Sequence, residues 1–83
     1  MFWYVYVLYN KSIKKFYTGF TGDPERRLKE HEAGIVRSTR RPGWNLVYFE
    51  ASLSKKDAVL RERQLKTGFG RGYLKRRISN FLR

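Results

Sequence analysis

The chain has 83 residues, of which 19 are Lys or Arg and seven are Asp or Glu, so its formal net charge is +12. This length predicts one small domain over residues 1–83, with a thin core to which the aromatic residues, 17% of the chain, contribute much of the buried area. The lack of cysteine excludes a disulfide framework and a thiolate zinc site, and the charge predicts a polyanionic partner, most commonly nucleic acid.

The first expected element is a β-strand in the apolar run Phe2–Tyr9. β-branched and aromatic side chains throughout this run are typical of a strand that is covered on both faces. The run is too short to span a bilayer and no basic region precedes it, so neither a membrane span nor a signal peptide is expected. The expected location is therefore the cytoplasm, and no membrane partner is expected.

A hairpin is expected next, because a polar turn at residues 10–14 precedes a second short strand, Lys15–Gly19. Asp23 can cap a following helix, which is expected to end at about Ala33 with Gly34 as its stop. The residues expected on the core face of this helix are Leu28 and Ile35.

The second half of the chain begins with a basic loop at residues 35–44, followed by a third expected strand, Asn45–Glu50. Ser54 resembles the start of a capping box for a second helix that runs to about Lys66, and Gly68–Gly72 predicts a helix end and a turn. The apolar positions of a last amphipathic helix are Leu74, Ile78, Phe81 and Leu82. The order β-β-α-β-α-α predicts a small α/β sandwich, with a three-stranded antiparallel or mixed sheet flanked by helices.

Glu62 is a candidate metal ligand in the second helix. It shares a face with Ala58 and Leu65, which should point to the sheet. A carboxylate in that position is costly to bury unless it is paired or binds a metal. The alternative is a surface salt bridge, with Arg61, Arg63 or Lys66 as the partner.

Four further side chains are candidates for phosphate chemistry. Arg27 and His31 lie one helical turn apart, where Arg27 could clamp a phosphate; the alternative is an ordinary solvated helix face. Tyr6 and Tyr17 lie in the two expected strands, where tyrosine usually serves packing. Gly19, which follows Tyr17 closely, permits another backbone or a ligand to approach.

Together these residues resemble the GIY-YIG nuclease domain. The first name-giving motif is represented by Tyr4-Val5-Tyr6 and the second by Tyr17-Thr18-Gly19. The other matching positions are Arg27-x-x-x-His31 and Glu62 within Leu60–Lys66, so the resemblance extends from residue 3 to about residue 80. The segment Leu65–Arg71 resembles the small single-domain branch, which is related to the first nuclease domain of the excision-repair incision subunit.

The chain departs from the name-giving motifs at two positions. Tyr4 stands in place of the first glycine and Thr18 in place of the second isoleucine, but both catalytic tyrosines are kept. The family also has a late asparagine near the site, for which Asn80 is the candidate in the last helix.

The resemblance implies a role for each matching residue. Glu62 would be the only direct protein ligand of one Mg²⁺ or Mn²⁺ ion, with water completing the shell. Tyr6 would help to deprotonate the attacking water, which requires nearby cations to favour its phenolate. Arg27 would stabilise charge on the phosphoryl group, and Tyr17 and His31 would orient water and phosphate.

The resulting hypothesis is a metal-dependent endonuclease that hydrolyses DNA phosphodiester bonds and selects structure or shape, including branched or single-stranded DNA, more than base sequence. RNA stays open as a substrate, and a protein partner could supply specificity. The basic residues expected to contact nucleic acid are Arg37, Arg40, Arg41, Lys66 and Arg71. The alternatives are a nucleic-acid-binding module with a relic active site and a basic protein that binds RNA or ribosomes without cleavage.

Overall fold

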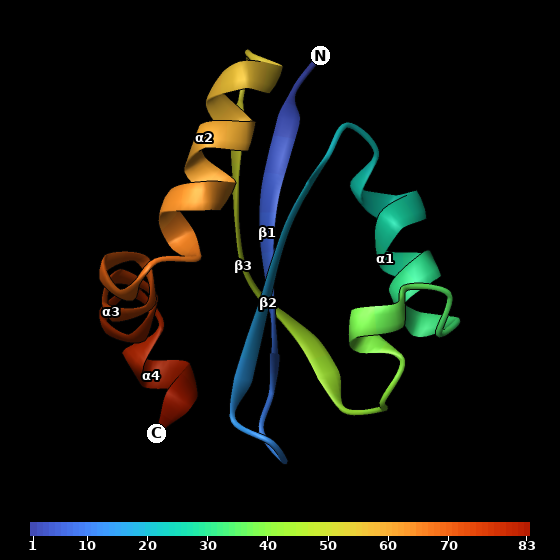
Figure 1. Cartoon of the computed structure of the whole chain (residues 1–83), viewed down its shortest axis with the longest axis vertical. Coiled ribbons are helices and arrows are strands. Elements are labelled where there is room, and N and C mark those ends of the chain that lie inside the picture. Colours follow the sequence, from blue (N-terminus) through green and yellow to red (C-terminus); the bar gives the residue numbers. More distant parts are fainter.

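The computed structural model describes all 83 residues and contains one three-stranded antiparallel sheet (Figure 1). Its strands are β1 (Trp3–Asn10), β2 (Lys15–Thr21) and β3 (Trp44–Ser52), in the order β2-β1-β3. β1 pairs with both neighbours, and a bulge interrupts its pairing with β3 between Val7 and Leu8. The α/β class and the order β-β-α-β-α-α are confirmed, and the sheet is purely antiparallel.

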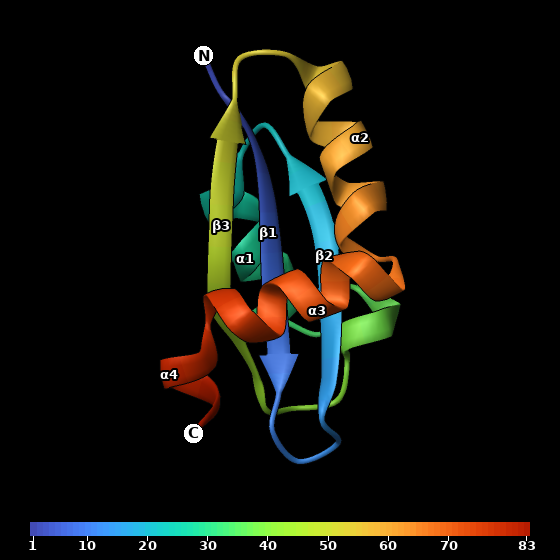
Figure 2. The ribbon, with the colours of Figure 1, turned by 90° about the vertical axis from the view of Figure 1, so that its left-hand side faces the viewer.

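Helices cover both faces of this sheet. They are α1 (Pro24–Glu32), the 3₁₀ helix η1 (Arg37–Thr39), α2 (Lys55–Leu65), α3 (Gly68–Arg77) and α4 (Ser79–Leu82). In Figure 1 the sheet is seen edge-on, with α1 and η1 on one side and α2, α3 and α4 on the other. Figure 2 shows α3 crossing in front of the strands while α1 lies behind them. None of these helices is long and apolar enough to cross a membrane.

The central strand explains the continuous apolar run near the N-terminus. Val5 and Val7 are fully buried against α2 and α3, where their partners in the core are Ala58, Leu65 and Leu74. Because side chains alternate along a strand, Tyr6 and Leu8 point to the other face, toward α1, and both are buried as well. A strand covered on both faces was predicted, and the burial confirms it.

Helix α1 begins and ends at the expected residues. The Asp23 side chain accepts a hydrogen bond from the Arg26 amide, and Gly34 follows the helix with a φ of +74°. Glycine adopts such a left-handed conformation without a steric cost, so it is a suitable stop. The prediction for Ile35 is wrong: the residue lies beyond this stop, in the loop, and is 69% exposed. Leu28 is half-buried.

The region after α2 differs most from the expectation. α2 ends at Leu65 as predicted, but Gly68–Gly72 is not a turn: it forms the first half of α3. The break lies before it, at Thr67, whose hydroxyl caps α3 by accepting from the Gly70 amide. Three glycines have a low helix propensity, but the close packing of α3 on α2 outweighs it.

Three smaller differences concern element ends. The last helix is not continuous, because it breaks at Ile78 into α3 and α4, and Phe81 is 41% exposed rather than core-facing. β3 extends beyond the predicted strand at both ends. Ser54 occupies the N-cap position of α2 as expected, but its side chain makes no capping hydrogen bond.

Candidate active site

Tyr6 lies at the centre of the candidate site, on the face of the sheet that α1 covers. Its direct neighbour on β2 is Gly19, and the tyrosine ring lies over the space that a side chain there would fill. A Cβ atom on Gly19 would lie 2.6 Å from the Tyr6 hydroxyl oxygen, so only glycine accommodates the ring in this position. The second motif thus requires glycine at this position because the Tyr6 ring fills the space of a side chain.

Helix α1 brings two side chains to the Tyr6 hydroxyl. Nε of Arg27 donates to the hydroxyl oxygen at 3.3 Å, and Nε2 of His31 lies 2.8 Å from the same oxygen. The two residues are four apart, which places them on one face of the helix. Nη1 of Arg27 also donates to a carboxylate oxygen of Glu30 at 3.0 Å, so the guanidinium is held from two sides.

Tyr17 completes this group from β2. Its ring centre lies 5.0 Å from that of His31 in an edge-on arrangement, and 6.3 Å from that of Tyr6. Four of the five predicted site residues therefore meet on one face of the sheet: Tyr6, Tyr17, Arg27 and His31. Strand pairing and the packing of α1 bring these residues together, although they are up to 25 residues apart in the sequence.

Glu62 belongs to α2, and Figure 1 shows this helix on the side of the sheet opposite α1. Its side chain is only 15% exposed and its ion pair is with Lys66, at 3.5 Å. No hydrogen bond or ion pair joins it to the tyrosine cluster. The Lys66 pair is the alternative raised from the sequence, and it involves only Oε1 of Glu62 and a lysine that is half exposed.

The donor set around Glu62 fits magnesium better than a transition metal. No group of three or more His, Cys, Asp or Glu side chains is assembled anywhere in the chain. Magnesium keeps several waters and is commonly held by one or two carboxylates together with substrate phosphates, so a single glutamate is sufficient for it.

Burial dominates the electrostatics of the cluster. It raises the pKa of Tyr6 to about 12, although the hydrogen bond from Arg27 acts in the opposite direction. The expectation that nearby cations would favour the phenolate is therefore not met, and the hydroxyl is protonated at neutral pH. Burial, followed by the charge of Arg27, lowers the pKa of His31 below its ordinary value of 6.5, so the imidazole is neutral. The hydrogen bonds to Tyr6 and then Glu30 raise the pKa of Arg27.

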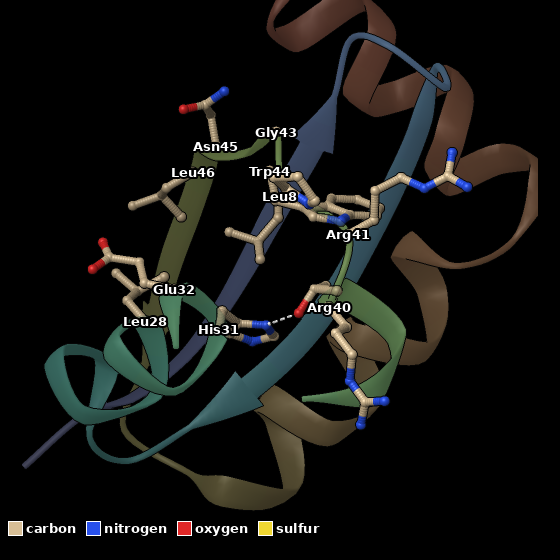
Figure 3. A pocket seen from close by; sticks show the side chains of 12 residues that line it. Leu8, Leu28, His31, Glu32, Arg40, Arg41, Gly43, Trp44, Asn45 and Leu46 are labelled. Carbon is tan, nitrogen blue, oxygen red and sulfur yellow. Dashed lines mark hydrogen bonds between the residues drawn. The ribbon is translucent and has the colours of Figure 1, made fainter. Parts of the chain in front are cut away.

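Thr39 is a further member of the site that the sequence analysis missed. It belongs to η1, is 2% exposed, and its hydroxyl oxygen lies 2.6 Å from Nδ1 of His31 (Figure 3). Figure 3 also shows the neighbouring Arg40 guanidinium pointing away from the His31 ring. No periodicity marks a threonine inside a basic loop, so the sequence offered no signal for it.

The five basic residues expected to contact nucleic acid lie in two places. Arg37, Arg40 and Arg41 are exposed on η1 and the loop after it, beside the tyrosine cluster. A groove of about 460 Å³ joins two of them to the cluster, since Tyr17, Arg37 and Arg41 all line it. Lys66 and Arg71 lie across the sheet, near Glu62 in sequence.

The pair on the far side, Lys66 and Arg71, is connected to β2 through Arg71. Arg71 is half-buried and donates through Nη1 to the Thr18 hydroxyl at 3.1 Å, which ties α3 to the second motif. Asn80, the candidate for the late asparagine, is exposed on α4. It makes no side-chain hydrogen bond to the tyrosine cluster.

Comparison with known proteins identifies this arrangement. Residues 2–80 match the family model described as the GIY-YIG catalytic domain. The chain belongs to the GIY-YIG family. Two UPF0213 proteins are similar to it: one of Haloquadratum walsbyi is 41% identical over 77% of this chain and 73% of its own length, and one of Staphylococcus haemolyticus is 42% identical over 77% and 79%.

A solved structure supports the same relationship. The solution NMR structure of a UPF0213 protein from Bacillus halodurans is 36% identical to this chain, with a TM-score of 0.56 over 89% of this chain and 82% of the other. Within the GIY-YIG family, this chain therefore resembles the small UPF0213 proteins. Its relation to the first nuclease domain of the excision-repair incision subunit stays a prediction.

Proposed function

We propose that this protein is a metal-dependent DNA endonuclease that hydrolyses phosphodiester bonds. The observation that carries the proposal is the environment of the Tyr6 hydroxyl, which is held between the Arg27 guanidinium and the neutral imidazole of His31. A tyrosine that served packing alone would not need a cation and a base on the same oxygen.

The chemistry begins with the proton on Tyr6. Because the pKa of Tyr6 is raised to about 12, a standing phenolate is not the base. The neutral His31 can take the Tyr6 proton on Nε2 while the Tyr6 oxygen takes a proton from the attacking water. The water is then activated as hydroxide, Tyr6 is neutral again, and His31 is an imidazolium. The short contact between the Tyr6 hydroxyl and Nε2 of His31 suits this proton transfer.

Arg27 has a second role toward the phosphate. Its Nε faces Tyr6 and its Nη1 faces Glu30, which fixes the plane of the guanidinium next to the position of the attacking water. A fixed guanidinium stabilises the negative charge that develops on the phosphoryl oxygens without reorganisation. Tyr17, in edge contact with His31, would orient the water or the phosphate.

Glu62 would hold the divalent cation, Mg²⁺ or Mn²⁺, with water in the other positions. Such an ion would supply positive charge that stabilises the phosphate as it is cleaved. The DNA backbone would follow the groove that joins Tyr17 to Arg37 and Arg41, since phosphate contacts there position the strand without reading bases. This predicts selectivity for structure or shape.

Cleavage assays on plasmid, single-stranded, flap and branched DNA, with and without magnesium, test the proposal. Glu62→Gln is isosteric, so the protein should fold, keep its affinity for DNA and lose magnesium-dependent cleavage. The matched control is Glu25→Gln, which removes the same charge from an exposed position in the first turn of α1.

Two outcomes would contradict the proposal. Normal cleavage by Glu62→Gln would make the carboxylate structural. Tight DNA binding without cleavage of any substrate, with either metal, would favour a binding module with a relic site.

A further inference from the structure

Thr39 is buried in a segment that is otherwise exposed. Its neighbours Ser38 and Arg40 face solvent, while Thr39 is 2% exposed and directs its hydroxyl to the ring of His31. The contact to Nδ1, at 2.6 Å, is shorter than the contact from Nε2 to Tyr6, at 2.8 Å. The histidine is thus held at both nitrogens, and the proposed reaction uses only one of them.

The direction of this hydrogen-bonded chain follows from its two ends. Arg27 can only donate, and its donation to the oxygen of Tyr6 favours the arrangement in which the Tyr6 proton points to Nε2 of His31. The backbone carbonyl of Val36 can only accept, and it accepts from the hydroxyl of Thr39 at 3.5 Å. The Thr39 oxygen is then the acceptor for a proton on Nδ1.

We propose that Thr39 is a positioning residue that holds His31 as the tautomer with its proton on Nδ1, so that Nε2 faces Tyr6 as an acceptor. The inference rests on the proposed function for its catalytic consequence, because only this tautomer can take the proton of Tyr6. The assignment of the tautomer itself rests only on the hydrogen-bond geometry around His31. A neutral imidazole carries its proton on whichever nitrogen its surroundings favour, and here the surroundings are Thr39.

Water could not replace this hydroxyl with the same effect. His31 and Thr39 both line a pocket of about 380 Å³ between α1, the η1 loop and β3, which Figure 3 shows from close by. If the hydroxyl were removed, a water molecule in this pocket could either donate to Nδ1 or accept from it. The tautomer would then no longer be fixed by the protein. Thr39 differs from such a water molecule because its hydroxyl is fixed in place and the Val36 carbonyl, at 3.5 Å, offers an acceptor for its proton.

The chain allows a direct measurement, because His31 is its only histidine. Nitrogen-15 NMR of the imidazole, recorded above the pKa of His31, should show a protonated Nδ1 and an unprotonated Nε2 in the wild-type protein. Thr39→Ser keeps the hydroxyl and should give the same spectrum. Thr39→Val keeps the shape but removes the hydroxyl, so the two nitrogen shifts should move toward each other. A proton on Nε2 in the wild type would overturn the proposal, even if the valine variant failed to fold.

Kinetics then test the consequence. In Thr39→Val, kcat should fall roughly 10- to 100-fold, the usual effect of losing an outer partner of a functional histidine, while KM and DNA affinity stay unchanged. Thr39→Ser should restore kcat, which a purely structural role for the side-chain shape would not explain. An unchanged kcat in a folded valine variant would overturn the catalytic role. The expected tautomer in a wild-type protein that cleaves no DNA would overturn the proposed function and keep the assignment of Thr39.

Discussion

Three polar or aromatic groups surround the Tyr6 hydroxyl, two from α1 and one from β2. Arg27 and His31 reach it from α1, Tyr17 lies beside it on β2, and Gly19 leaves the space in which its ring lies. The contacts give the hydroxyl a donor and an acceptor at the same time. Its proposed role in proton transfer therefore depends on these partners more than on its own acidity, which burial reduces.

Tyr6→Phe tests this dependence because it removes the hydroxyl and keeps the ring. If the hydroxyl transfers a proton, the cleavage rate should fall by roughly 10²- to 10⁴-fold, the usual contribution of a positioned acid–base group. Tyr17→Phe should lose less, since the proposed proton transfer does not pass through the Tyr17 hydroxyl. Both variants are compared with the wild type at equal circular dichroism and equal DNA affinity; full activity in both would reduce the tyrosines to packing residues.

The pKa of His31 predicts a pH dependence of stability. Burial and Arg27 lower this pKa in the folded protein, whereas the unfolded chain keeps the ordinary value of 6.5. Below 6.5, and down to the folded pKa, the unfolded state therefore binds more protons than the folded state. The free energy of unfolding then rises with pH through this window and is highest above it.

Melting temperatures measured between about pH 5 and about pH 7.5 test the sign of this effect. The wild-type protein should lose stability as the pH falls through the window. His31→Gln carries no titrating group and should give a flatter curve, while carboxylates contribute equally to both proteins. Parallel curves for the two proteins would show that His31 has the same pKa in both states.

Among the elements, the joint between α2 and α3 determines where Arg71 lies. Gly70 is buried in this joint, and a Cβ atom on it would overlap the backbone of Gln64 and Leu65. The glycine thus allows α3 to pack directly on the end of α2. That packing places Arg71 against Thr18 of the second motif, over the ring of Phe16.

Gly70→Ala should destabilise the protein strongly, by more than about 2 kcal/mol, because a backbone cannot move aside as a side chain can. Gly68→Ala is the matched control, because Gly68 lies in the same helix but has no atom within 4 Å of its added Cβ. That change should be neutral or stabilising by up to about 1 kcal/mol. Chemical denaturation of both variants measures the difference, and equal stabilities would mean that the joint relaxes.

At the scale of the molecule, the basic residues behind the net charge of +12 are distributed unevenly around the sheet. One basic group is the exposed loop that carries Arg37, Arg40 and Arg41, on the side of α1. Another is the end of α3, where Lys75, Arg76 and Arg77 are exposed on the opposite side. Only the first adjoins the tyrosine cluster, through the groove lined by Tyr17.

This asymmetry predicts different salt dependences. DNA affinity should fall steeply with salt, with a log–log slope of about −0.9 for each phosphate contact. Replacing Arg37, Arg40 and Arg41 by Gln should make the slope shallower by about two to three contacts. The same replacement of Lys75, Arg76 and Arg77 removes equal charge and should change the slope less. Equal changes in both triple variants would mean that binding is diffuse.

The sequence by itself determined what depends on neighbouring residues. A continuous run of β-branched and aromatic side chains predicted the central strand, and Asp23 and Gly34 marked the two ends of α1, since capping is a local interaction. The same local reasoning failed for Gly68–Gly72, where contacts with α2 decide the conformation. It failed also for Ile35, because the periodicity of a helix carries no information beyond its stop.

Only the tertiary structure decided the chemistry of the candidate site. Strand register places Gly19 beside Tyr6, and packing of α1 brings His31 to the same hydroxyl. Thr39 follows from the path of the η1 loop, which no local pattern encodes. The direction of both pKa shifts also depends on this packing, since burial removes water from charged forms and exists only once the chain has folded.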